Sequence, residues 1–142
     1  MKTIVCTLIV LCIFISDACA LSYEIIASEI GHIQYANNNT AVKRKGKSKY
    51  YYEVYEDMKV VRKTKVESLE TGMVTSADTV YDIIGESKDT ASIIHAMGRP
   101  APDEYELLAI SPTFVMSSRS VGKYIIVSTS QVLEKHYISK NN

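Results

Sequence analysis

The segment Tyr50–Val66, YYYEVYEDMKVVRKTKV, has the clearest pattern in this 142-residue chain. Its side chains alternate between two faces, and it is rich in aromatic and β-branched residues, which favour extended backbone. One face carries Tyr50, Tyr52, Val54, Met58, Val60, Thr64 and Val66. The other carries Tyr51, Glu53, Tyr55, Asp57, Lys59, Lys63 and Lys65. The pattern predicts one long half-buried strand, or two strands bent near Glu56 and Asp57.

The residues before this segment predict another strand and a loop. Ser22–Tyr35 alternates apolar and polar residues, and we expect a bulge in it near Gly31. Asn37–Thr40 favours a turn, because asparagine side chains bond to their own backbone. The charged segment Lys43–Lys49 follows, and we expect it to be a solvated loop tip.

After the segment, the apolar spacing becomes helical. Ala77, Val80, Tyr81 and Ile84 stand at positions i, i+3, i+4 and i+7, which is the spacing of one buried helical stripe. Residues 75–78 resemble a capping box. The sequence therefore predicts a helix that covers the sheet.

A second short helix is expected next, followed by three strands. The helix begins at Ser87 or Asp89 and buries Ala91, Ile94 and Met97. The strands are Tyr105–Ile110, Thr113–Ser117 and Lys123–Leu133. The order β-β-α-α-β-β-β predicts an α+β fold, with an antiparallel sheet of about five strands covered on one face by the helix pair.

Residues 1–20 have the composition of a cleaved export signal. Lys2 precedes an apolar stretch from Ile4 to Ile15, and Ala18-Cys19-Ala20 forms a small-x-small cleavage site. The stretch is shorter than the roughly 20 residues that a membrane-spanning helix needs, so we expect no stable membrane anchor. The protein is expected to be secreted, with 21–142 as a single domain. All three cysteines lie in the leader, so the mature chain is cysteine-free.

The sequence offers two sites of covalent modification. Asn38-Asn39-Thr40 is an N-glycosylation acceptor in an expected loop, and a eukaryotic source would favour a glycan on Asn38. Cys19 follows the small residue Ala18, as in a bacterial lipoprotein, but Asp17 argues against acylation. The source of the chain decides between these interpretations.

The formal charge of zero hides a strong separation of charge along the chain. Residues 43–65 contain nine Lys or Arg and three acids, a local charge of +6. Residues 67–106 contain nine acids and two Lys or Arg, a local charge of −7. The two segments either neutralise each other across the sheet or form two faces of opposite sign.

The basic cluster and its neighbouring tyrosines predict a binding surface. The cluster comprises Lys43, Arg44, Lys45, Lys47 and Lys49. Charge of this kind recognises polyanions such as heparin-like sugars or anionic lipid, and adjacent rings add stacking. Tyr51 and Tyr55 are the aromatic candidates, since tyrosine favours contact surfaces. A solvated tip with no partner explains the same residues.

Two histidines and a lysine give an alternative, catalytic interpretation. His32 lies in the first expected strand and His136 near the end of the last, and two imidazoles with Lys135 can cleave phosphodiesters by general acid and base steps. The three histidines have no metal-ligand spacing, and we expect no metal and no cofactor. Serine-nucleophile and phosphate-loop motifs are absent from the sequence.

These observations favour a small secreted binding protein over an enzyme. We expect it to engage an extracellular protein or a polyanion through the tyrosine-rich strand and the basic cluster, with nucleic acid disfavoured. The alternatives are a secreted nuclease-like hydrolase that uses His32 and His136, and a self-assembling structural component that uses an exposed edge strand. The sequence leaves the oligomeric state open.

Overall fold

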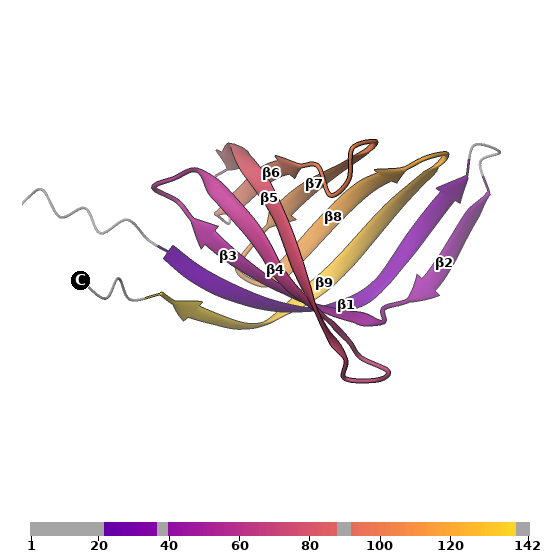
Figure 1. The fold of residues 1–142 in the computed structure, drawn as a ribbon, viewed down its shortest axis with the longest axis horizontal. Helices are drawn as coiled ribbons and strands as arrows, with labels where there is room; N and C mark the ends of the chain where they lie inside the picture. Colours follow the sequence, from indigo (N-terminus) through magenta and orange to yellow (C-terminus); the bar gives the residue numbers. More distant parts are fainter. Residues whose placement is uncertain (1–21, 37–39, 88–91, 139–142) are drawn as a thin grey trace, which may run out of the picture.

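The computed structural model describes residues 22–36, 40–87 and 92–138, and the regular elements in these ranges are all strands (Figure 1). The strands are β1 (Ser22–Ala36), β2 (Ala41–Lys45), β3 (Ser48–Tyr55), β4 (Val60–Ser68), β5 (Val74–Ser87), β6 (Ile93–Gly98), β7 (Glu104–Ile110), β8 (Phe114–Val121) and β9 (Tyr124–Tyr137). The predicted leader, Asn38, and Asp89 and Ala91 of the second predicted helix lie outside the described residues.

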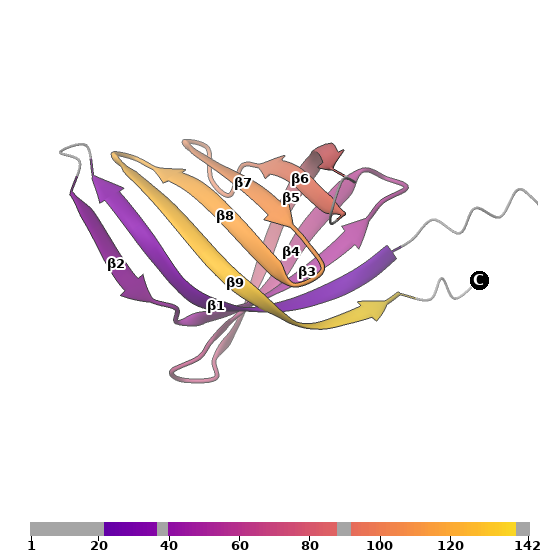
Figure 2. The same ribbon diagram turned by 180° about the vertical axis from the view of Figure 1, so that it is seen from behind.

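The strands form one antiparallel sheet that closes into a barrel. The order is β2-β1-β3-β4-β5-β6-β7-β8-β9, and β1 also pairs with β9, which closes a ring of eight strands. Figures 1 and 2 show β1 and β9 side by side along their length. On its other edge, β1 pairs with β3 through its first half and with β2 through its second half. Closure leaves β2 as the one edge strand among the described residues.

The predicted α+β fold is therefore wrong, because both predicted helices are strands. In β5 the side chains alternate: Val80 and Ile84 are 48% and 59% exposed, whereas Tyr81 is fully buried. In β6 Met97 is likewise exposed, while Ile94 is buried. The helical stripe combined residues from both faces of a strand. The described residues contain no helix long and apolar enough to span a membrane.

Several strand predictions are confirmed. β1 has the expected bulge, a register shift between Glu29 and Gly31. The opening segment is two strands, β3 and β4, joined by a turn at Glu56–Lys59. The turn changes which residues face inward, because alternation does not continue through it. Val61 and Lys63 consequently point into the barrel, and the prediction that Lys63 lies on the face opposite to Tyr52 and Val54 is wrong, because all four are buried.

The basic segment is also more ordered than predicted. Instead of a loop tip, Ala41–Lys45 forms β2, which pairs with the end of β1 through Lys45 opposite Gly31 and Ala41 opposite Tyr35. All five β2 side chains are exposed. An edge strand rich in lysine and arginine resists pairing with other chains.

The two oppositely charged segments neutralise each other in part, through ion pairs between strands. Ion pairs within the described part of the chain join the basic segment 43–65 to the acidic segment 67–106. They are Lys47–Glu70, Lys49–Glu67, Lys59–Glu86, Arg62–Asp78 and Lys63–Glu106. The first four lie at the surface, where such pairs add little stability. The last lies inside the barrel.

The apolar core fills the end of the barrel beside the β3–β4 and β7–β8 turns. It is made of inward-facing residues from seven strands. Among them are Tyr23, Ile25, Val54, Val61, Ile94, Ile110 and Val115, each at most 5% exposed. Burial of a side chain of this size stabilises the fold by about 1.5 to 3 kcal/mol. This plug closes one end and leaves the rest of the interior to polar residues.

Candidate ligand cavity

The interior beyond the apolar plug contains a cavity of about 580 Å³. This volume lies within the range of small-molecule sites, about 300 to 1,000 Å³. Its ionisable lining residues include Glu29, His32, Tyr50, Lys63, Glu106 and Arg119. Much of the remaining wall consists of hydroxyl groups and apolar side chains. The hydroxyl groups belong to Ser48, Thr79, Ser117 and Ser128, and the apolar side chains are those of Val66, Ala77 and Ile126.

The bulge in β1 directs two polar side chains into this cavity. In a regular strand, residues three apart face opposite sides of the sheet. The register shift between Glu29 and Gly31 removes this alternation, so that Glu29 and His32 both line the cavity while Ile30 points outward and is 61% exposed. Bulges often re-aim side chains at functional sites.

The carboxylate of Glu29 is held by two hydrogen bonds. Its Oε1 lies 3.1 Å from Nδ1 of His32, and its Oε2 accepts the backbone N–H of Lys47 at 3.0 Å. Gly46 packs directly against Glu29: a Cβ on Gly46 would stand 2.0 Å from the Glu29 carbonyl oxygen. The glycine thus allows the chain between β2 and β3 to fold over Glu29.

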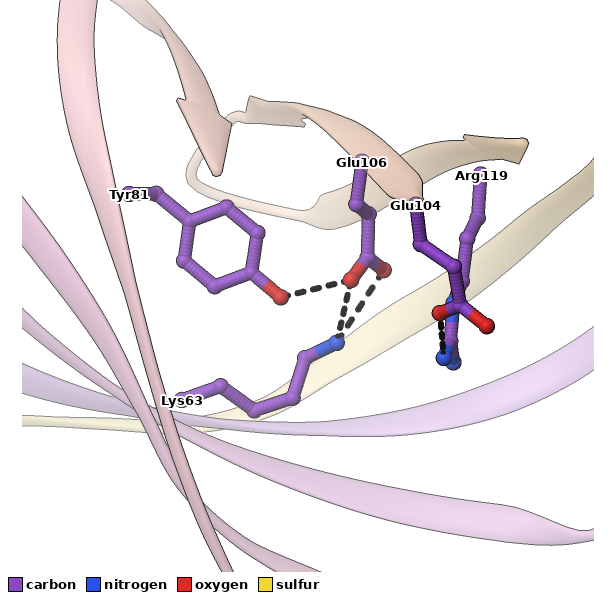
Figure 3. Close-up of polar contacts among 5 residues, drawn as sticks. All are labelled: Lys63, Tyr81, Glu104, Glu106 and Arg119. Carbon is purple, nitrogen blue, oxygen red and sulfur yellow. Dashed lines mark hydrogen bonds and ion pairs between the residues drawn. The ribbon is translucent and has the colours of Figure 1, made fainter. Parts of the chain in front are cut away.

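A second carboxylate, Glu106, binds a buried ammonium. Nζ of Lys63 donates to both oxygens of Glu106, at 3.0 and 2.8 Å, and the hydroxyl of Tyr81 donates to Oε2 at 2.6 Å (Figure 3). Lys63 is 7% exposed and Glu106 4%. No buried side-chain nitrogen or oxygen of the described residues lacks a hydrogen-bond partner, as a polar interior requires.

Three tyrosine rings surround the Lys63 ammonium. Its Nζ lies 5.5, 5.9 and 5.4 Å from the ring centroids of Tyr50, Tyr52 and Tyr81. These distances fall within the range of cation–π attraction, about 6 Å. Burial lowers the pKa of Lys63, and the Glu106 carboxylate opposes that shift.

The three tyrosines around Lys63 keep their protons well into the alkaline range. The pKa of Tyr50 is raised to about 12, mainly by burial and secondly by the negative charge of Glu29. Burial, and next the charge of Glu106, also raises the pKa values of Tyr52 and Tyr81. All three phenols are therefore neutral hydrogen-bonding groups at neutral pH.

A third carboxylate, that of Glu104, neutralises Arg119 in the wall. Arg119 on β8 donates from Nε to Oε2 of Glu104 on β7 at 2.8 Å, and its Nη2 contacts the same oxygen. Figure 3 shows this pair beside the Glu106 network. The Lys47 ammonium points elsewhere, to Glu70 at 2.9 Å, and is 63% exposed.

The predicted catalytic residues do not come together. His32 is opposite Ser128 and His136 is opposite Glu24, so eight residues of β1, about 26 Å, separate their positions. His136 is exposed and lies 2.7 Å from Glu134. Lys135 lies at the plugged end, with Nζ 3.8 Å from the ring centroid of Tyr23.

The predicted binding residues lie on the outside of the barrel. Lys43, Arg44 and Lys45 extend from β2 into solvent. Lys49 and the hydroxyl of Tyr51 both contact Oε2 of Glu67, at 2.9 and 2.6 Å.

The other predicted surface tyrosine, Tyr55, donates its hydroxyl to Glu53 at 2.7 Å. The hydroxyls of both predicted tyrosines are therefore engaged within the sheet, and their pKa values are raised by the carboxylates that accept them. Only the rings remain as partly exposed surface.

Most of the cavity residues were not predicted, although the sequence pattern contains a signal for them. In β7, Glu106 is in phase with Leu108 and Ile110, which are both buried. In β4, Lys63 is in phase with Val61, and in β8 Arg119 is in phase with Val115. A charged residue in phase with buried apolar ones indicates a polar barrel interior.

The described residues contain no group of three or more His, Cys, Asp or Glu side chains arranged to hold a metal ion. The cavity instead offers carboxylates, hydroxyls and aromatic rings, which suit an organic ligand. Comparisons with protein-family models, with curated proteins and with solved structures found no match for this chain.

Proposed function

We propose that this chain is a binding protein that holds one small polar organic molecule inside its barrel. The main support for this proposal is the cavity of about 580 Å³, with its ordered polar wall. An eight-stranded barrel has an interior that side chains either fill or leave open for one small ligand. Here the apolar plug fills one end only.

The order of the wall supports binding. The carboxylates of Glu29, Glu104 and Glu106 each have fixed partners, so the polar groups are positioned before a ligand arrives. Preorganisation of this kind reduces the entropy lost on binding. Export of the chain, expected from residues 1–20, would place this binding outside the cell.

Calorimetric titration of the mature chain tests the proposal. We would use three probes of one shape, benzylammonium, benzyl alcohol and benzoate, which are positive, neutral and negative. The proposal expects at least one to bind with one molecule per chain. The variant Ser117→Phe places a ring in the cavity from β8 and should weaken that binding.

The matched control is Ser118→Phe, which places the same ring one residue along β8, where the side chain does not line the cavity. It should bind like the wild type. Equal binding by Ser117→Phe, or no binding of any probe at about 10 mM, would count against a ligand cavity.

A second candidate function uses the outside of the barrel. The edge strand β2 presents Lys43, Arg44 and Lys45, all exposed, with Lys47 nearby. We propose that this strip is the part of the molecule that attracts a polyanionic or acidic extracellular partner. The support is the concentration of positive charge on a free edge.

A further inference from the structure

We propose that the ligand of the cavity is an organic ammonium ion, and that Glu29 is its counter-ion. This inference rests on the proposed function and names the chemical class of the ligand. It is drawn from the charge balance of the wall, from the unused acceptors of Glu29, and from the way the same barrel holds its own ammonium.

The charge balance of the wall is the first argument. The lysines and the arginine that line the cavity already have carboxylate partners: Lys63 pairs with Glu106, Arg119 with Glu104 and Lys47 with Glu70. Among the described residues, Glu29 is the carboxylate of this wall that has no lysine or arginine partner; its ion-pair partner is the imidazole of His32, which carries charge only when it is protonated. Its side chain is 5% exposed. A buried carboxylate of this kind attracts a cation strongly, because little water screens it.

The acceptor geometry of Glu29 is the second argument. A carboxylate has about four lone-pair sites. His32 and the Lys47 backbone N–H occupy one site on each oxygen. Two sites remain for donors from the cavity, and a primary ammonium supplies three. A carboxylate ligand would face an acceptor here and would have to displace Glu104 or Glu106 to reach a cation.

The Lys63 site is the third argument, since it shows how this interior stabilises an ammonium. There, a carboxylate with both oxygens within 3.0 Å and three tyrosine rings within 6 Å surround Nζ. Tyr50 belongs to that ring set and also lines the cavity. Glu29 and Tyr50 therefore offer a free cation the same two kinds of interacting group, a carboxylate and an aromatic face.

The experiment compares benzylammonium with benzyl alcohol and benzoate by NMR titration of the folded mature chain. The backbone N–H of Lys47 donates to Glu29, so its resonance reports on that carboxylate directly. We expect benzylammonium to shift the Lys47 amide, with a dissociation constant of about 1 mM or lower. The alcohol and benzoate should bind at least about tenfold more weakly.

The variant Glu29→Gln removes the charge and keeps an acceptor for the Lys47 N–H. It should weaken benzylammonium binding by about tenfold or more and leave benzyl alcohol unchanged. The control Glu53→Gln removes one charge from the outer wall and should bind as the wild type does. If Glu29→Gln does not fold, the wild-type Lys47 shift still decides the question.

The outcomes separate the two proposals. Binding of benzoate or benzyl alcohol in the cavity as tightly as benzylammonium overturns the ammonium assignment and leaves the binding function standing. Equal affinity of Glu29→Gln and wild type for benzylammonium also overturns it. Failure of all three probes to bind overturns both proposals.

Discussion

The ammonium of Lys63 on β4 contacts both carboxylate oxygens of Glu106 on β7 inside the barrel, although the two residues are 43 positions apart. The pair joins opposite sides of the interior and lies between the apolar plug and the cavity. A buried pair is costly to desolvate, and removal of one partner leaves an uncompensated charge. It therefore fixes the arrangement of the interior more than it adds stability.

Lys63→Met should destabilise the fold strongly, because Glu106 would remain buried without its cation. We expect a loss of about 3 to 5 kcal/mol in the free energy of unfolding, measured by urea denaturation. Adding Glu106→Leu should restore much of that loss. Arg62→Met, on the outer face of the same strand, is the control and should change stability little. If Lys63→Met alone changed the free energy of unfolding only slightly, Lys63 and Glu106 would not form a buried ion pair.

Gly46→Ala should destabilise the protein by about 2 kcal/mol or more, since its Cβ would collide with the Glu29 backbone. It should also shift the Lys47 amide resonance. Gly85→Ala is the control, because a Cβ at Gly85 meets nothing within 4 Å, and its stability should be unchanged or raised by about 0.5 kcal/mol. Equal stability of the two variants would show that Gly46 does not pack against β1.

Stability should fall between pH 10 and pH 12. Burial raises the pKa values of Tyr23 and Tyr50 to about 12, whereas the unfolded phenols titrate near 10. The unfolded chain therefore loses protons first, and each tyrosine lowers the free energy of unfolding by about 1.4 kcal/mol per pH unit within this window. Below pH 10 the contribution is fully present.

Denaturant titrations at successive pH values measure this slope. Tyr50→Phe should reduce it, because one of the shifted phenols is gone. An identical slope in the variant and the wild type would mean that Tyr50 is not buried in the folded state.

Reversal of charge on the basic strip of β2 should weaken polyanion binding without unfolding the chain. The variant carries glutamate at Lys43, Arg44, Lys45 and Lys47, which are all exposed. We expect it to elute from a heparin column at markedly lower salt than the wild type. The control carries the same four charge changes at the exposed residues Lys59, Lys65, Arg99 and Lys123. Equal elution of both variants would show that β2 has no special role.

The sequence predicted the strands of this fold better than its closure. β1 with its bulge, the β3–β4 pair and the later strands follow alternation that can be read directly. The error at β5 arose because Val80 and Ile84 are apolar and yet point outward, where they complete a helix-like spacing with Tyr81. Alternation is obscured wherever the outer face of a barrel is partly apolar.

The cavity was harder to predict than the strands. A lysine on a strand is usually solvated, so the sequence favours the outer face for Lys63. Its distant partner Glu106 and the three tyrosine rings around it make its burial possible. These contacts depend on closure between β1 and β9, which no local pattern encodes.

The most direct test of the ligand cavity is a crystal structure of residues 21–142 equilibrated with a saturating concentration of benzylammonium. We expect one molecule inside the barrel, with its ammonium on the carboxylate of Glu29 and its ring beside Tyr50. Benzylammonium found only on the outer wall, or an interior filled by the chain's own side chains, would contradict the proposal.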